Sequence, residues 1–126
     1  MPKVYDIDKH FYPDSETYPD LYLDLYTLPL GLVDDAGKLS KSQGMNYILS
    51  VIERYLKEVY GMIINIPDEH GNMVEKPLKK NMLIKKKENG EYDLSEVYFE
   101  PLRDIFTWIL DASAGLTTEE KKRLGQ

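Results

Sequence analysis

Tyrosines and carboxylates alternate through the first part of the chain, and their types and spacing suit molecular contact better than bond-breaking chemistry. The candidate contact residues are Tyr12, Tyr18, Tyr22 and Tyr26, with Asp14, Glu16, Asp20 and Asp24 between them. A tyrosine ring offers a large contact area at a small entropic cost, and tyrosine is therefore enriched in protein interfaces. This pattern predicts a surface that binds a protein. The alternative is that some rings belong to the core and that the carboxylates are merely solvated.

Negative charge is concentrated in the same region. Residues 1–37 hold eight acidic residues against two lysines, a net charge of −6 that equals the formal charge of the whole chain. An acidic protein repels nucleic acid, so we expect no direct contact with it. Closely spaced carboxylates could instead imitate a row of phosphates and occupy the binding surface of a nucleic-acid-binding protein.

Positive charge gathers in a second segment, residues 76–87, which contains six lysines and no acidic residue. The lysines of this possible basic patch are Lys76, Lys79, Lys80, Lys85, Lys86 and Lys87. They could contact phosphate, an acidic partner or the acidic region of a second copy. The alternative is that they protect an exposed edge strand from aggregation, which is a common use of lysine.

Signals for catalysis are weak in comparison. The chain has no cysteine, which excludes a thiolate nucleophile, cysteine-bound zinc and iron–sulfur clusters. His10 and His70 have carboxylates nearby in the sequence, but neither has a second ligand at the spacing of a zinc helix. Glycine-rich phosphate loops and nucleophile elbows are also missing. We therefore expect a protein that is not an enzyme, with no metal and no cofactor.

Two segments carry the spacing of amphipathic helices. Residues 42–60 repeat apolar side chains with a helical period, and Ser40 or Ser42 is the expected cap, with Gly61 at the end. Residues 100–111 repeat the pattern, with the helix beginning near Glu100 and Pro101 at the tolerated first helical position. Thr117 and Glu120 form a capping box that predicts a short C-terminal helix.

The remaining segments favour strands and turns. Residues 21–28 alternate as a strand does, although the same leucines also fit a helical stripe, and residues 29–37 have the composition of a loop. A hairpin is expected from 62–66 and 73–76, and a second strand pair from 81–86 and 91–94 around Asn89-Gly90.

Together these elements predict a single α+β domain over residues 1–126. Two main amphipathic helices would pack on a small antiparallel β element. An extended acidic, tyrosine-rich arm and loop (residues 1–37) would precede a helix–hairpin–helix core (residues 38–126), and a short helix would end the chain.

The function expected from this layout is that of a non-catalytic interaction or assembly protein, of a kind found in phages and mobile elements. Its partner would be another protein or a second copy of the chain. An acidic inhibitor that mimics nucleic acid is the alternative, and a small ligand-binding domain or enzyme is a further one. No apolar run reaches the length of a signal peptide or a membrane span, so we expect a cytoplasmic protein without a membrane partner.

Overall fold

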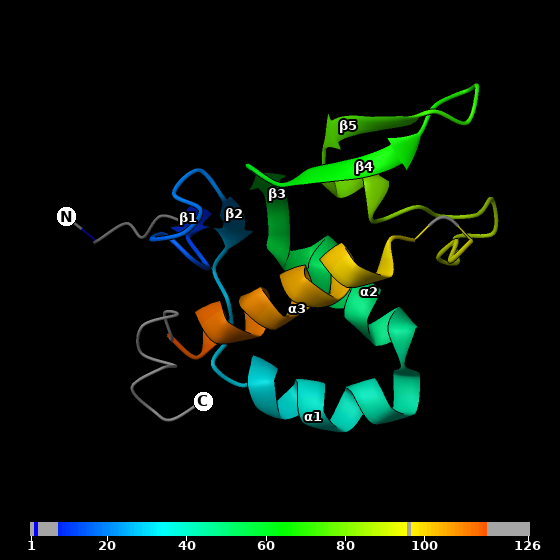
Figure 1. The fold of residues 1–126 in the computed structure, drawn as a ribbon. Helices are drawn as coiled ribbons and strands as arrows, with labels where there is room; N and C mark the ends of the chain where they lie inside the picture. Colours follow the sequence, from blue (N-terminus) through cyan, green and yellow to red (C-terminus); the bar gives the residue numbers. More distant parts are fainter. Residues whose placement is uncertain (1, 3–7, 96, 116–126) are drawn as a thin grey trace.

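The computed structural model describes residues 2, 8–95 and 97–115 and has the predicted α+β fold (Figure 1). Strands β1 (Asp8–Phe11), β2 (Tyr22–Tyr26) and β3 (Leu56–Tyr60) form an antiparallel sheet in the order β1-β2-β3, and β4 (Ile63–Pro67) pairs with β5 (Met73–Pro77) in a separate hairpin. The helices are α1 (Leu32–Gln43), α2 (Met45–Tyr55) and α3 (Phe99–Ser113), with a 3₁₀ turn η1 (Lys80–Met82). The predicted C-terminal helix lies outside the described residues.

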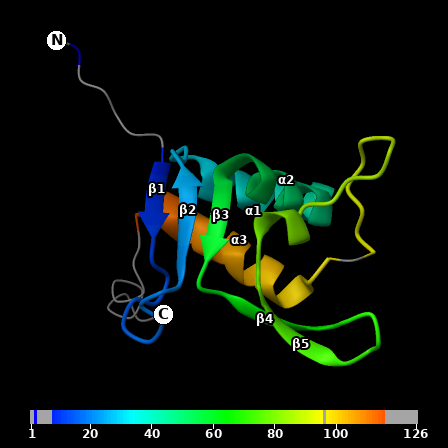
Figure 2. The same ribbon diagram turned by 90° about the horizontal axis from the view of Figure 1, so that it is seen from above.

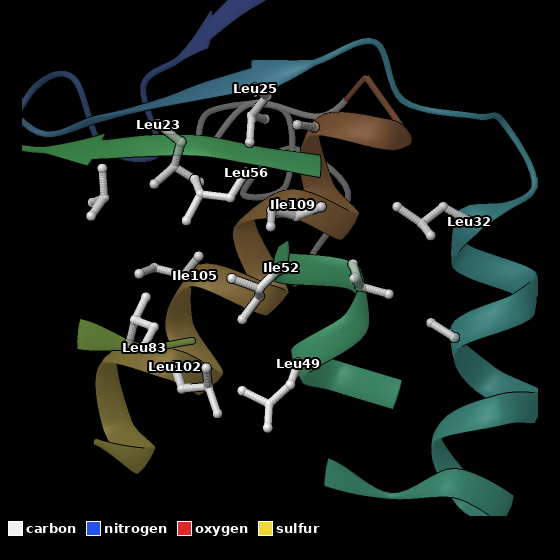
Figure 3. Packing of buried hydrophobic residues seen from close by; sticks show 14 of the residues in the cluster. Leu23, Leu25, Leu32, Leu49, Ile52, Leu56, Leu83, Leu102, Ile105 and Ile109 are labelled. Carbon is white, nitrogen blue, oxygen red and sulfur yellow. The ribbon is translucent and has the colours of Figure 1, made fainter. Parts of the chain in front are cut away.

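The core lies between the inner face of the three-stranded sheet and the helices (Figure 3). Leu23 and Leu25 of β2 and Leu56 of β3 are fully buried, and they face Ile52 of α2 and Ile109 of α3. Burying a large aliphatic side chain contributes about 1.5–3 kcal/mol before chain entropy is subtracted. This layer therefore holds the sheet in place and leaves its opposite face toward solvent.

Strand β2 confirms the strand interpretation of residues 21–28. Leu21, Leu23 and Leu25 are buried, and Tyr22 and Asp24 between them are only partly buried on the other face. Pairing with β1 on one side and β3 on the other makes β2 the central strand. The alternation in sequence is thus the alternation between core and outer face.

The predicted helix over 42–60 is wrong at both ends. Ser40 and Ser42 lie inside α1, and α2 starts only after Gly44, whose φ of 61° and ψ of −135° are open to glycine and strained for other residues. At the other end the chain becomes extended at Leu56 and continues as β3. Gly61 does have a positive φ, 78°, but it ends a strand and not a helix.

A β-bulge explains why β3 resembles a helix in sequence. Asp24 pairs with Glu58 and Leu25 pairs with Leu56, so Lys57 is an extra residue in the strand. The extra residue lets Leu56 and Val59, which are three positions apart, both face the core. A three-residue spacing of apolar side chains is typical of a helix. The helical pattern in the sequence therefore continues without a break from α2 into β3.

The loop predicted over 29–37 is also wrong, because α1 starts at Leu32. Leu32 and Ala36 are buried one turn apart, and Asp34 and Asp35 lie in the first turn, where negative charge is favourable. Gly37 is exposed within this helix and weakens it without breaking it. The boundary drawn after residue 37 therefore falls inside a helix.

The remaining predictions have mixed outcomes. The hairpin over 62–66 and 73–76 is confirmed as β4 and β5, and helix 100–111 is confirmed within α3. Its start is earlier than expected, because α3 begins at Phe99, and Pro101 is therefore the third helical residue and not the first. The second strand pair is wrong as an extended hairpin: only one bridge joins Lys86 to Tyr92 among the described residues, around the turn at Gly90. Residues 80–82 form η1 in its place.

Candidate protein-binding surface

The outer face of the β1-β2-β3 sheet carries a row of contacting tyrosines. Tyr22 on β2 lies opposite Tyr60 on β3, and their rings stack with centroids 4.8 Å apart and 19° between planes. The Tyr12 ring, just beyond β1, lies 5.2 Å from the Tyr22 ring on the other side. We call Tyr12, Tyr22 and Tyr60 the aromatic row. It crosses the sheet at right angles to the strands.

The aromatic row faces solvent and not the core. Tyr12 is 43% exposed and Tyr60 is 37% exposed, while Tyr22 between them is partly covered by its neighbours. Burial raises the pKa of the Tyr22 hydroxyl, and the neighbouring tyrosines and the Asp24 carboxylate raise it further. The hydroxyl at the centre of the row therefore remains neutral and able to donate a hydrogen bond at physiological pH.

A cation already binds one end of the row. The ammonium group of Lys79, in the segment before η1, lies 5.3 Å from the centre of the Tyr60 ring. This distance is within the range of an attractive cation–π contact. The Tyr60 ring therefore presents its electron-rich face to positive charge.

Next to the aromatic row lies a second row of polar side chains, which we call the polar row: His10 on β1, Asp24 on β2 and Glu58 on β3. The strand register places His10 opposite Asp24 and Asp24 opposite Glu58. Glu58 is satisfied, because its Oε2 accepts a hydrogen bond from the backbone N–H of Lys80 at 2.7 Å. The His10 ring lies 4.8 Å from the Tyr22 ring, which joins the two rows.

Asp24 is the unusual member of the polar row. Its side chain is only 13% exposed, and its Oδ1 is buried with no hydrogen-bond partner among the described residues. Nε2 of His10 lies 3.7 Å from this oxygen, which is too far for a hydrogen bond. A buried oxygen without a partner costs about 1–3 kcal/mol, so this carboxylate weakens the fold.

The loop between β1 and β2 places the other predicted contact residues beside this face. Tyr18 is 59% exposed, and Glu16 and Asp20 are also exposed. Asp14 caps the loop, since its Oδ1 accepts the Thr17 N–H at 3.1 Å. Tyr26 is half-buried at the far end of β2, on the same face as Tyr22 and Asp24.

The structure spreads the six lysines over three places instead of one surface. Lys76 lies on β5, Lys79 and Lys80 lie at η1, and residues 85–87 lie in the loop that follows. Figures 1 and 2 both place this loop at the opposite end of the molecule from β1. Several of the lysines face acids of the same chain, as the contacts of Glu53 and Asp93 show.

Glu53 of α2 anchors part of the lysine segment. Its carboxylate pairs with Lys86 Nζ at 3.0 Å and accepts a hydrogen bond from the Tyr92 hydroxyl at 2.7 Å. Lys80 Nζ donates to the Glu53 carbonyl at 2.8 Å. Lys85 and Lys87 lie near Asp93 and contribute, after its hydrogen bonds with Ser95, to the lowered pKa of that carboxyl. Much of the positive charge is thus matched internally.

Two open hollows lie in the neighbourhood of this segment. One has a volume of about 370 Å³ and is lined by residues such as Glu53, Lys57 and Lys80. The other, about 830 Å³, lies between Asn46 and the residues that follow Lys87. In the described part of the chain, no group of three or more His, Asp or Glu side chains is placed to hold a metal ion. Within residues 2, 8–95 and 97–115, no helix has the length and apolarity to cross a membrane.

Three members of the surface could not be placed from the sequence. Tyr60 and Glu58 were assigned to a helix, and His10 was considered only as a metal ligand. Pairing of β2 with β1 brings His10 to the outer face. Pairing of β2 with β3 brings Tyr60 and Glu58 there, and the distance along the chain between these two strands hides it. Gly61, directly after Tyr60, was a signal in the sequence that Tyr60 could end a strand. A glycine with positive φ often ends a strand as well as a helix.

Comparisons with known proteins add no relative. No protein-family model matches the chain, and searches of curated proteins and of solved structures gave no significant match. The geometry of the molecule is therefore the basis for its proposed function.

Proposed function

We propose that this chain is a non-catalytic protein that binds or assembles with a protein partner through the outer face of its β1-β2-β3 sheet. The observation that carries the proposal is the aromatic row, in which the central Tyr22 contacts Tyr12, just beyond β1, and Tyr60 on β3, and the two outer rings are well exposed. The solvent face of an antiparallel sheet is usually polar. Large rings on that face are what a protein interface uses as anchors.

The rings also have a structural use, and a test must separate the two. Cross-strand aromatic pairs contribute about 0.5–1.5 kcal/mol to a fold. If stability were their only purpose, removal of the outer rings would lower the melting temperature and change nothing else. If they bind a partner, their removal abolishes association and leaves a folded protein.

The decisive experiment compares wild type with the double variant Tyr12→Ser/Tyr60→Ser. Association is followed in two ways, by sedimentation equilibrium of the pure protein and by capture from an extract of the source organism. Phe99→Ser is the matched control, because Phe99 is 56% exposed and is the first residue of α3, a helix on the core side of the sheet. Circular dichroism checks that all variants fold.

We expect wild type and Phe99→Ser to form the same complex, with themselves or with one partner, and the double variant to lose it. A double variant that keeps the complex would contradict the proposal. So would equal losses in the double variant and in Phe99→Ser, because any exposed ring would then serve.

A further inference from the structure

The chemistry of the sheet face indicates what kind of partner it binds. This inference rests on the proposed function and names the group that the face would recognise. We infer that Asp24 is the anchor for a guanidinium group, and that the partner presents an arginine-bearing segment to the outer face of the sheet.

Beyond Lys9 on β1, charge is of one sign through to the end of β2. Residues 10–26 contain four carboxylates and no lysine or arginine. Three of these, Asp14, Glu16 and Asp20, lie in the loop beside the face, and Asp24 lies on it. A partner segment with positive charge is complementary to this surface, and a negatively charged one would be repelled.

Asp24 gives that charge a specific position. Its Oδ1 is buried without a hydrogen-bond partner among the described residues, although Glu58 on the next strand has one. Natural proteins satisfy most buried polar atoms, and an exception calls for an explanation. A carboxylate that weakens the free protein and would be satisfied only in a complex is typical of a binding residue.

An exposed side chain lies beside this oxygen. His10 Nε2 lies 3.7 Å from Oδ1, and the His10 side chain is 55% exposed on the edge strand β1. Rotation of His10 outward would open space on its side of the carboxylate. In its place an incoming group could make the short contact that His10 does not make.

The neighbouring rings favour arginine over lysine. A guanidinium is planar, stacks on aromatic rings and donates two parallel hydrogen bonds to a carboxylate, whereas an ammonium does neither as well. Tyr22 lies next to Asp24 on the same face, and Tyr12 extends the ring surface toward the acidic loop. Lys79 on Tyr60 shows that the far end of the row already holds a cation.

The test uses peptides of defined chemistry, since the partner is not identified. The probe is a nine-residue peptide of alternating serine and arginine, compared with the same peptide carrying lysine or citrulline in place of arginine. Citrulline keeps the shape of arginine and removes its charge. Binding is followed by ¹H–¹⁵N NMR titration at pH 8, where an ordinary histidine is neutral.

We expect the arginine peptide to shift the amide signals of residues 10, 22 and 24, the lysine peptide to bind more weakly, and the citrulline peptide not to bind. Asp24→Asn should weaken arginine binding about tenfold or more, because a buried charge pair loses one member. Glu69→Gln is the matched control, since it removes the same charge from the exposed hairpin turn. Its affinity should remain within about twofold of wild type, as expected for a distant charge in ordinary salt.

Several results would overturn the inference: equal losses in Asp24→Asn and Glu69→Gln, equal binding of the lysine peptide, or signal changes confined to the loop over 85–93. Failure of the anchor is distinguishable from failure of the proposed function. If Tyr12→Ser/Tyr60→Ser loses the natural complex while Asp24→Asn keeps it, the face still binds a partner, but Asp24 is not its anchor.

Discussion

Tyr22 and Tyr60 are stacked across β2 and β3, with ring centroids 4.8 Å apart, at the point where Gly61 turns the chain out of the sheet. A Cβ atom at Gly61 would lie 2.1 Å from the Asp20 carbonyl oxygen and 2.9 Å from the Leu21 Cα. The backbone at Gly61, which follows Tyr60, is therefore in close contact with the backbone at Asp20 and Leu21, which precede Tyr22. The absence of a side chain at Gly61 allows Tyr60 to come this near to Tyr22.

Gly61→Ala should consequently damage both the fold and the aromatic row. The positive φ costs an alanine about 1–2 kcal/mol, and the overlap with backbone atoms that cannot rotate away adds about 1–3 kcal/mol. We expect a loss of about 2–5 kcal/mol in the free energy of unfolding, measured by urea denaturation. NMR contacts between the rings of Tyr22 and Tyr60 should weaken as well.

Gly71→Ala is the control for this effect. Gly71 has a similar φ of 82°, but a Cβ there meets open space. We expect it to cost only about 1–2 kcal/mol, the left-handed strain alone. Equal losses in the two variants would mean that the contact with Asp20 and Leu21 has no energetic weight.

The same region shows which parts of the fold could be predicted from sequence. Leu21, Leu23 and Leu25 have the strict alternation of a half-buried strand, and β2 was predicted correctly from this local pattern. Leu56 and Val59 mislead because a bulge at Lys57 gives a strand the spacing of a helix. Bulges depend on pairing with another strand, which local periodicity does not contain.

The candidate site divides in the same way. Tyr22 and Asp24 could be placed on one face by alternation alone. The register that brings His10 beside them joins β2 to the preceding strand, and the one that brings Tyr60 joins β2 to β3 beyond two helices. Only the folded sheet reveals both. The unsatisfied oxygen of Asp24 is likewise a property of packing, so composition could indicate an acidic surface but not its anchor.

Glu53 offers a prediction about the lysine-rich segment. Its pKa lies below the usual 4.5 because the Tyr92 hydroxyl donates to it, with further help from Lys86 and Lys80. A lowered carboxyl pKa contributes stability that is present above the unfolded pKa and lost as pH falls through the folded one. Glu53→Gln should therefore cost about 1 kcal/mol at pH 7, a modest value because the side chain is 37% exposed.

The measurement is urea denaturation of wild type and Glu53→Gln at pH 7 and at pH 3. The difference between them should shrink at the lower pH, where the wild-type carboxyl becomes protonated. Glu88→Gln, which changes an exposed acid in the following loop, should match wild type at both pH values. An undiminished cost of Glu53→Gln at pH 3 would show that the carboxylate charge is not the cause.

Tyr92 makes the complementary prediction at alkaline pH. Burial, followed by the hydrogen bond to Glu53, raises the pKa of its hydroxyl from 10.0 to about 12. Between these values the unfolded chain releases the proton and the folded chain retains it, so this residue's contribution to stability falls as pH rises from about 10 to 12. Thermal melts from pH 8 to 11.5 should decline less steeply for Tyr92→Phe than for wild type. Tyr18→Phe, at a ring that is 59% exposed, should follow the wild-type curve.

The β4–β5 hairpin should open independently of the core. Every residue of the two strands is at least partly exposed, and Figure 2 shows the hairpin projecting from the body of the molecule. Its turn is held by Asp68, whose Oδ1 accepts the N–H groups of His70 and Asn72, each at 2.9 Å. A short two-stranded ribbon is marginal by itself, so these bonds carry a large share of its local stability.

Asp68→Ala removes both bonds and should lower the opening free energy of the hairpin by about 1–2 kcal/mol. In hydrogen exchange, we expect amides of β4 and β5 to exchange about tenfold faster, while those of Ile105 and Ile109 in α3 keep the wild-type rate. Asp68→Asn retains an acceptor oxygen and should restore most of the protection. If α3 lost protection to the same extent as the hairpin, the two would unfold as one unit, and the ribbon would be a cooperative part of the core and not an independent arm.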